Sequence, residues 1–272
     1  MPKPAKQIPP KVVFGVEEPV LRLLEEAGIL FLNIWHCFKF IFTGRIDWMK
    51  AIVQAALVGF DSLGMSILIC LIAGSVLALQ TAAKFAQTGA DNYVGGLVAL
   101  AIVREIGPIF TCLAVGARAG TAIAAEIANM KVTEQVDALR VMRIDPIRYL
   151  MLPRVLACIF ALPLLTVIGE VVAIVGGMLV AQAVANLHYH KYIESVWLYL
   201  KPSDIRFSLL KSAVFGLILA AISCTVGLNA KGGARDVGLS TTKAVVWISI
   251  IIIITDFFLT WIFYGTSYDG GA

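Results

Sequence analysis

Five long apolar segments constrain the fold of this chain more than any other feature. Each approaches or exceeds the length of about 20 residues that a helix needs to cross a bilayer. The segments are Leu57–Leu79, Tyr93–Ala117, Val155–Ala185, Leu210–Leu228 and Ala244–Tyr264. The chain is 59% hydrophobic and 15% charged, whereas soluble proteins are about 45–50% apolar and about 25% charged. The sequence therefore predicts an all-α integral membrane protein with five transmembrane helices.

The first 50 residues differ from the rest of the chain. Residues 1–16 are rich in proline and lysine, which is typical of a disordered tail. Residues 17–50 carry early charges and then the apolar run 27–38, which at about a dozen residues is too short to span a bilayer. This pattern favours an N-terminal interfacial (elbow) helix that lies in the plane of the membrane. Residues 51–272 are expected to form a single membrane domain.

A charged stretch, 124–153, separates the second apolar segment from the third. Its charged residues are Glu126, Lys131, Glu134, Asp137, Arg140, Arg143, Asp145 and Arg148. A charged side chain at the centre of a bilayer costs at least ~2.5–3.5 kcal/mol. The stretch is therefore expected to form a polar hairpin outside the bilayer.

Local signals inside this stretch predict an ordered pair of helices. Apolar residues recur at helical spacing, which gives a short helix with one apolar stripe: Val132, Val136, Leu139 and Met142. Thr133 is a candidate N-cap of this helix. Asp145 followed by Pro146 is typical of an N-cap with proline at the first helical position, so a second helix is expected to begin there.

The same stretch carries a family resemblance. The sequence AAEIANMKVTEQVDALRVMRIDPIRYLMLPRVLA, together with REIGP at 104–108, resembles the MlaE (YrbE) family of permease subunits of lipid-transporting ABC systems. The E-Q-x-D-A-L and D-P-x-x-x-L-x-x-P-R blocks are its most specific parts, and the resemblance runs from about Leu57 to the C-terminus. Arg143 departs from the family pattern, which usually has a small residue there. The resemblance implies that residues 51–272 are an MlaE-type permease domain.

The resemblance also implies a function and partners. Members are membrane subunits of ABC phospholipid transporters in the inner membrane of Gram-negative bacteria, where they maintain the lipid asymmetry of the outer membrane. They form a homodimer that binds two ATPase subunits, an MCE-domain protein outside the membrane and often a small STAS-domain protein. The phospholipid substrate lies between the two permease copies. No nucleic acid takes part.

The helix in the charged stretch is interpreted as a cytoplasmic coupling helix between the second and third spans. In the family the corresponding segment docks on the ATPase, and its charges would set the register of docking. The residues expected to take part are Glu126, Glu134, Gln135, Asp137, Leu139, Arg140 and Met142. A solvated helix face remains an alternative. Acid/base catalysis is disfavoured because no histidine, nucleophile or metal-ligand spacing accompanies the carboxylates, so no catalytic residue is assigned.

The chain has no G-x-x-x-x-G-K-[ST] motif to hold nucleotide phosphates. ATP and Mg²⁺ are therefore expected on a partner ATPase, and no cofactor in this chain. The cysteines are all in apolar segments without C-x-x-C spacing, and His188 and His190 have no third ligand nearby. Neither a metal site nor a disulfide is predicted.

Arg104 and Glu105 interrupt the second apolar segment and are the main candidates for a binding site. Adjacent helical residues do not face each other, so each needs its own partner, and Lys211 is the expected opposite charge in the fourth segment. Snorkelling to the membrane surface is the alternative. In the family this region and the fourth-span lysine line the lipid pocket. The expected pocket residues are Arg104, Glu105, Lys211, Leu71, Val76, Leu77 and Leu79.

Basic residues in the loops indicate the orientation, because Lys and Arg concentrate on the cytoplasmic side. One side carries the basic N-terminal tail, Arg118, Lys131, Arg140, Arg143, Arg148, Arg154, Lys231, Arg235 and Lys243. The other side carries Lys84, Lys191, Lys201, Arg206 and Lys211. The N-terminus and the charged stretch are therefore expected in the cytoplasm and the C-terminus in the periplasm.

Three other functions stay open. The D-A-L sequence followed by L-x-L-P at 150–153 also resembles the coupling loop of importer-type ABC permeases for small solutes. Asp61, Glu170 and Asp256 lie inside predicted spans, so they are candidates for the ion relay of a secondary transporter. A membrane scaffold without transport activity is the third alternative.

Overall fold

The computed structural model describes residues 28–30, 32–37, 39–40, 47–86, 91–230 and 232–265, and these contain helices and no strand. The α-helices are α2 (Trp48–Ala86), α3 (Val94–Ala101), α4 (Gly107–Val115), α5 (Thr121–Val132), α6 (Gln135–Val141), α7 (Leu152–Ala185), α8 (Tyr189–Tyr199), α9 (Pro202–Leu228) and α10 (Ala234–Thr260). A short 3₁₀ helix, η1 (Asp91–Tyr93), precedes α3. Wider π-helical turns form η2 (Ile102–Ile106), η3 (Gly116–Gly120), η4 (Ile147–Met151) and η5 (Trp261–Gly265).

The described residues contain five helical segments that are long and apolar enough to cross a membrane, which confirms the all-α fold with five spans. They are Trp48–Phe85, Val94–Val132, Ile147–Ala185, Pro202–Leu228 and Ala234–Gly265. The second span is continuous through η2, α4, η3 and α5, because π-helical turns join its α-helical parts without a break. All five spans are longer than the sequence predicted, since charged residues near their ends remain helical.

Two helices extend past the bounds drawn from the sequence for this reason. The helix of the second span continues to Val132, so the polar hairpin consists of residues 133–146 instead of 124–153. The helix of the first span begins at Trp48, so the last residues of the predicted interfacial region 17–50 belong to α2. Residues 28–30, 32–37 and 39–40 of that region are helical. The rest of it, and the predicted tail 1–16, lie outside the described residues.

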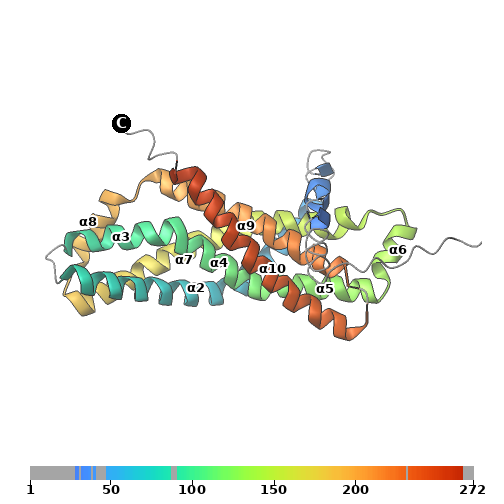
Figure 1. The fold of residues 1–272 in the computed structure, drawn as a ribbon, viewed down its shortest axis with the longest axis horizontal. Coiled ribbons are helices and arrows are strands. Elements are labelled where there is room, and N and C mark those ends of the chain that lie inside the picture. Colours follow the sequence, from blue (N-terminus) through green and yellow to red (C-terminus); the bar gives the residue numbers. More distant parts are fainter. Residues whose placement is uncertain are drawn as a thin grey trace, which may run out of the picture.

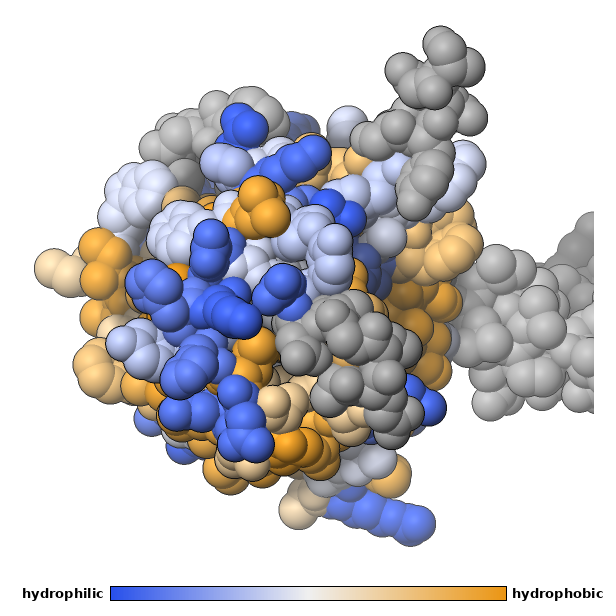
Figure 2. Space-filling view, turned by 90° about the vertical axis from the view of Figure 1, so that its left-hand side faces the viewer, coloured by the Kyte–Doolittle hydropathy of each residue, from blue (hydrophilic) through white to orange (hydrophobic). Residues whose placement is uncertain are grey.

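The spans run side by side along the long axis of the molecule (Figure 1). The hairpin with α6 lies at one end, which we call the hairpin end, and α8 lies at the opposite end, which we call the α8 end. Hydrophilic side chains gather over the α8 end, with hydrophobic side chains around them (Figure 2). The polar ends and the apolar lengths of the helices agree with a molecule that crosses a bilayer along this axis.

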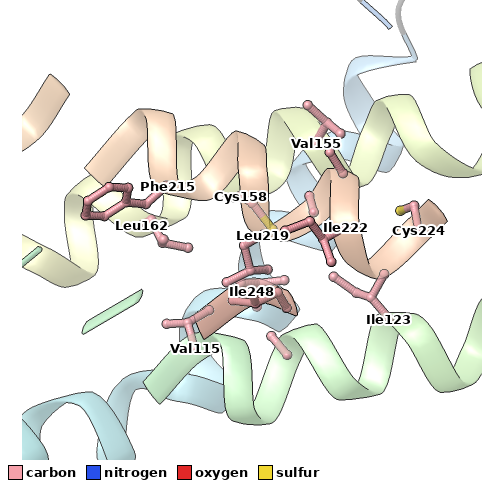
Figure 3. Packing of buried hydrophobic residues seen from close by; sticks show 14 of the residues in the cluster. Val115, Ile123, Val155, Cys158, Leu162, Phe215, Leu219, Ile222, Cys224 and Ile248 are labelled. Carbon is pink, nitrogen blue, oxygen red and sulfur yellow. The ribbon is translucent and has the colours of Figure 1, made fainter. Parts of the chain in front are cut away.

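The main hydrophobic core lies between α5, α7, α9 and α10, towards the hairpin end (Figure 3). Ile123, Cys158, Leu219 and Ile248 are among its buried side chains. Ile248 of α10 lies directly over the glycines of the sequence Gly116-x-x-x-Gly120, where a larger side chain would collide with it. The small-residue spacing therefore allows α10 to pack closely on the second span.

Helix α8 packs on α3. Its buried Tyr192 lies against the backbone position of Gly95. The hydroxyl of Ser195 accepts a hydrogen bond from the backbone N–H of Gly96 at 2.9 Å. That N–H is in the first turn of α3, where backbone donors have no partner within their own helix. A side chain distant in sequence therefore caps α3.

Glycine also sets the distance between α2 and α7, the most closely paired helices in the bundle. A Cβ atom at Gly74 would overlap the backbone carbonyl of Ala173, which cannot move without separating the two helices. We expect Gly74→Ala to lower the stability of the folded protein by about 1–3 kcal/mol, the usual cost of overpacking. The thermal unfolding midpoint of the detergent-solubilised protein measures this effect.

Gly64→Ala on the same helix is the matched control, because nothing lies within 4 Å of a Cβ atom there. Alanine is the better helix former by about 1 kcal/mol. The control should leave the unfolding midpoint unchanged or raise it. Equal midpoints for the two variants would contradict close backbone contact between α2 and α7.

Candidate functional site

Three spans place charged side chains together inside the bundle, in the half nearer the α8 end. We call this group the polar network, and its members are Arg104, Glu105, Asp204, Lys211, Asp256, Thr260 and Tyr264. They come from η2, α9, the end of α10 and η5. The π-helical turns η2 and η5 both contribute to the network, and such turns occur frequently at functional sites.

Lys211 is the centre of the network and is fully buried. Its Nζ donates to the Glu105 carboxylate at 3.2 Å and to the Asp256 carboxylate at 3.0 Å. It also donates to the backbone carbonyl of Arg104 at 2.8 Å and to the Thr260 hydroxyl at 2.6 Å. The structure thus brings Lys211 to Glu105, as expected, and adds two partners from α10 that sequence reasoning missed.

Arg104 has a partner of its own. Its Nε and Nη2 atoms lie 3.0 and 2.9 Å from Oδ1 of Asp204, and its guanidinium lies over the ring of Tyr264, 4.5 Å from the centroid. The other carboxylate oxygen of Asp204 accepts from the backbone N–H of Lys201 at the start of α9. Sequence reasoning missed Asp204 because a carboxylate in the first turn of a helix is usually a cap, and here it is both a cap and an ion-pair partner.

The polar network has more acidic than basic side chains, so it does not favour the binding of an anion. Arg104 and Lys211 are opposed by the carboxylates of Glu105, Asp204 and Asp256, so the group has an excess of acid. The Nζ of Lys211 has acceptors around it and does not reach the surface. The side chains of Arg104 and Glu105 are 36% and 37% exposed. Lys211 therefore holds α9 to its neighbours, and the neighbouring Arg104 and Glu105 are the charged groups that a ligand can reach.

The three acids proposed for an ion relay have separate partners. Asp256 binds Lys211, and Glu170 of α7 accepts a hydrogen bond from Ser208 of α9. Asp61 of α2 pairs with Arg118 of η3 at 3.6 Å. Arg118 is about 20 Å along the second span from Arg104 at 1.5 Å per residue. The structure does not line up the three carboxylates into one path.

The apolar residues predicted for the pocket lie in different environments on α2. Leu71 packs against Gly176 of α7, and Leu77 packs on the core cluster around Ala78 and Tyr192. Val76 and Leu79 are exposed on the outer surface of the chain. Further exposed apolar side chains lie next to the network members Asp256 and Thr260 in the sequence of α10.

The hairpin holds a single short helix, α6, which begins differently from the prediction. Thr133 is not its N-cap, because its N–H and hydroxyl both donate to the carbonyl of Asn129 and so end α5. Glu134 stands at the N-cap position instead, without a side-chain cap. The predicted start of the following helix is confirmed: Asp145 accepts from the backbone N–H of Ile147 at 2.9 Å, with Pro146 in the first turn.

The apolar stripe of α6 points into its own chain. Val136 and Leu139 are buried against Leu150, with Met130 and Leu228 around them. Leu139, expected to contact an ATPase, therefore fixes the hairpin to the ends of the spans. The exposed hairpin residues are Thr133, Glu134, Gln135, Ala138, Arg140, Val141, Met142, Arg143, Ile144 and Asp145. Val141 was missed because it lies outside the predicted stripe.

Charge pairs hold the hairpin in shape. Asp137 lies 2.8 Å from the Nζ of Lys131 on α5 and 3.1 Å from Nη1 of Arg140. The hydrogen bond from Lys131 lowers the pKa of the Asp137 carboxyl below its ordinary value. Asp137 is therefore ionised at neutral pH and links α6 to α5.

Glu134 and Arg143, on either side of α6, have left-handed backbone conformations, with φ of 61° and 59°. This region costs a residue with a Cβ atom about 1–2 kcal/mol. The strain at Arg143 explains why a small residue suits that position. Glu134 is exposed, and its side chain has no hydrogen bond or ion pair within the described residues. Backbone strain of this kind is frequent at functional sites, which makes Glu134 a candidate for contact with a partner.

Among the described residues, no three His, Cys, Asp or Glu side chains are grouped so that they could hold a metal ion. The cysteines of the same residues are all buried and free.

Comparisons with known proteins give one consistent result. The sequence profile of the family described as Permease MlaE matches residues 51–262. A probable ABC transporter permease protein of Rickettsia prowazekii is 37% identical over 254 residues, covering 93% of this chain and 98% of that protein. One from Synechocystis is 40% identical over 231 residues, with coverages of 85% and 88%. The Arabidopsis thaliana chloroplast protein trigalactosyldiacylglycerol 1 is 39% identical over 229 residues, with coverages of 84% and 65%.

Proposed function

Because the chain belongs to the MlaE permease family of ABC transporters, we propose that it moves phospholipids between the inner membrane of a Gram-negative bacterium and an MCE-domain protein outside it. The chain is a multi-pass membrane permease. ATP and Mg²⁺ would bind to a separate ATPase subunit. The transport would maintain the lipid asymmetry of the outer membrane.

The observation that carries this proposal is an apolar stripe on α10 beside the exposed part of the polar network. Ile253, Phe257 and Trp261 recur at i, i+4 and i+8 and are exposed. Each is next to, or three residues from, Asp256 or Thr260, which belong to the polar network with Glu105. An amphiphile can therefore place its acyl chains along the stripe and its headgroup at Arg104 and Glu105.

The chemistry of this headgroup site suits a zwitterionic phospholipid. Arg104 offers a guanidinium that can donate to a phosphate. Glu105 offers a carboxylate that can accept from an ammonium group. The acid excess of the network disfavours a ligand that is purely anionic. Val76 and Leu79, which are exposed on α2, would form the opposite apolar wall in a homodimer, where each residue occurs twice around the two-fold axis. Leu71 and Leu77 would support this wall from inside the chain.

We infer the positions of the remaining partners from the two ends of the molecule. The exposed residues of the hairpin would dock on the ATPase in the cytoplasm, and a small STAS-domain protein would bind the ATPase. The α8 end would face the periplasm and the MCE-domain protein, with the C-terminus on the same side. The name of the Arabidopsis relative, which contains that of a glycolipid, supports a lipid substrate. The separate partners of Asp61, Glu170 and Asp256 disfavour the ion-relay alternative.

Transfer of labelled phospholipid tests this function directly. The complex of the chain with its ATPase, in proteoliposomes, should move phospholipid to the acceptor protein only when ATP is supplied. Phe257→Ala should lower the transfer rate about tenfold, because the acyl chains would lose their dispersion contacts with the phenyl ring. ATPase co-purification should be unchanged, since Phe257 is far along α10 from the hairpin end.

Leu179→Ala is the matched control, because Leu179 is exposed on α7 and has no place in the proposed path. It should transfer lipid at the rate of the unmodified chain. Equal losses in Phe257→Ala and Leu179→Ala would contradict the α10 path, and absence of any ATP-dependent lipid transfer by the unmodified complex would contradict the function.

A further inference from the structure

An ion pair joins the two spans that carry the hairpin. Glu126 lies on α5, one to two turns before the hairpin, and Arg154 lies in the first turn of α7, after the chain has returned. The Nη2 atom of Arg154 is 2.8 Å from Oε1 of Glu126. The pair therefore spans the base of the hairpin and connects the second span to the third.

Burial of the Arg154 guanidinium would cost free energy without this partner. Its side chain is only 6% exposed, and a buried cation without an opposite charge is costly. Its Nη1 donates to the carbonyl of Leu150 in η4 at 2.7 Å, and its Nε has no partner within the described residues. Glu126, which is half exposed, supplies the compensating charge.

Neighbouring contacts make the base of the hairpin one rigid block. Leu150, whose carbonyl Arg154 holds, also packs on the α6 residues Val136 and Leu139. Gly227 near the end of α9 fits against the side chain of Ile127 and the backbone of α5. The hairpin and the adjacent ends of α5, α7 and α9 are therefore packed together. A force on the hairpin is transmitted to these ends and not absorbed by a loop.

The two spans joined by the pair both lead to the polar network. The second span is helical without interruption from Glu126 back to Arg104 and Glu105 in η2. The third span continues from Arg154 to Glu170, which is bonded to Ser208 of α9, one turn from Lys211. A displacement of the hairpin that moves both spans together would therefore move Glu105 and Glu170 at the same time. If the two spans slid past each other at the base of the hairpin, the displacement would not be transmitted to the polar network.

We propose that Arg154 and Glu126 are positioning residues for transport, and that their ion pair makes the second and third spans move as one when the ATPase displaces the hairpin. The pair contacts neither substrate nor nucleotide. This proposal rests on the proposed function, because it assigns the pair a part in coupling ATP hydrolysis to phospholipid transfer.

The test is a double-mutant cycle with Glu126→Gln, Arg154→Gln and the double variant in the complex with the ATPase in proteoliposomes. The number of phospholipid molecules transferred per ATP hydrolysed is the readout, because a merely structural role would reduce transfer and hydrolysis in proportion. Each single variant should lower this ratio about fivefold. The double variant should be no worse than the poorer single one, since residues that act as a unit are not additive. Arg154→Lys should retain part of the ratio because its ammonium can still pair with Glu126.

A second readout does not depend on the substrate. The cysteines of the described residues are all buried, so a cysteine introduced at the exposed Trp261 beside the polar network gives a selective probe of that site. In the chain with an intact pair, ATP should change the labelling rate of Trp261→Cys. In Glu126→Gln and Arg154→Gln that change should be lost while the ATPase remains bound.

Asp61→Asn with Arg118→Gln is the matched control, because it removes another ion pair between spans, one that is half exposed and remote from the hairpin. It should leave the ratio and the labelling response intact. Unchanged ratios in the single variants, or multiplying losses in the double variant, would overturn the proposal. If the unmodified complex transfers no phospholipid, the proposed function fails, and the labelling response still decides whether the pair couples the two spans.

Discussion

Lys211→Glu is expected to abolish the folded bundle. The variant would place a fourth carboxylate among those of Glu105, Asp204 and Asp256, with Arg104 as the remaining cation of the network. Removing one partner of a buried ion pair costs about 3–5 kcal/mol, and reversing its charge costs more. That is a large share of the stability of about 5–15 kcal/mol that a folded protein has. Size-exclusion chromatography of the detergent-solubilised protein should show aggregate in place of a monodisperse peak.

A neutral variant separates the fold from the function of the network. Lys211→Met combined with Glu105→Gln and Asp256→Asn removes the cation together with the carboxylates it holds, so that no buried charge is left without its partner. This triple variant should recover the monodisperse peak but transfer lipid at least tenfold more slowly, because Glu105 no longer offers a charge to a headgroup.

Lys243→Met on the exposed part of α10 is the control for loss of a lysine, and it should behave as the unmodified chain. A folded and stable Lys211→Glu would show that the network is solvated, and would favour the snorkelling alternative for Arg104 and Glu105. Full transfer activity in the triple variant would show that the network holds the helices together and does nothing more.

Glu134→Gly is expected to make the hairpin more stable and the complex weaker. Glycine adopts a φ of about 60° at little steric cost, so the backbone strain at Glu134 is relieved. The same change removes a carboxylate that has no partner within the described chain. If that carboxylate docks on the ATPase, the lost charged contact should weaken association about tenfold or more, since truncating one partner of a buried charge pair at an interface costs about 2–5 kcal/mol.

The measurement pairs thermal unfolding of the isolated permease with the dissociation constant for the ATPase. Arg143→Gly is the matched control, because Arg143 has the same left-handed conformation and is also exposed. It should stabilise the chain to a similar extent and leave ATPase binding near its original strength. If Glu134→Gly stabilises the chain and binding is unchanged, the strained glutamate is not the docking group, and the solvated-face alternative gains support.

Local and compositional features were predictable from the sequence. The number of spans and the all-α class follow from the length of the apolar segments, because a bilayer imposes that length on every helix that crosses it. The cap at Asp145 and Pro146 was predictable because its atoms lie within three residues of one another. That Arg104 and Glu105 need separate partners follows from helix geometry alone.

Features that depend on where one helix meets another were not predictable in the same way. The stripe of α6 could be found from periodicity, but Leu150 and Leu228 decide that it faces its own chain. Thr133 has the residue type of an N-cap, but α5 continues further than its charges suggest and uses Thr133 to end. A residue of a capping type can therefore end one helix instead of beginning the next.

For the polar network, too, the sequence determined one part and the tertiary structure decided the other. The sequence determined that charged groups in apolar spans need partners, and identified Lys211 as one of them, because an unpaired charge inside a membrane is costly wherever it lies. Only the tertiary structure decided that Asp204, Asp256 and Thr260 complete the group and that Lys211 is enclosed by it. These partners lie about 45 to 155 residues apart along the chain, and their distances depend on how the helices pack, which the interdigitation of the side chains determines.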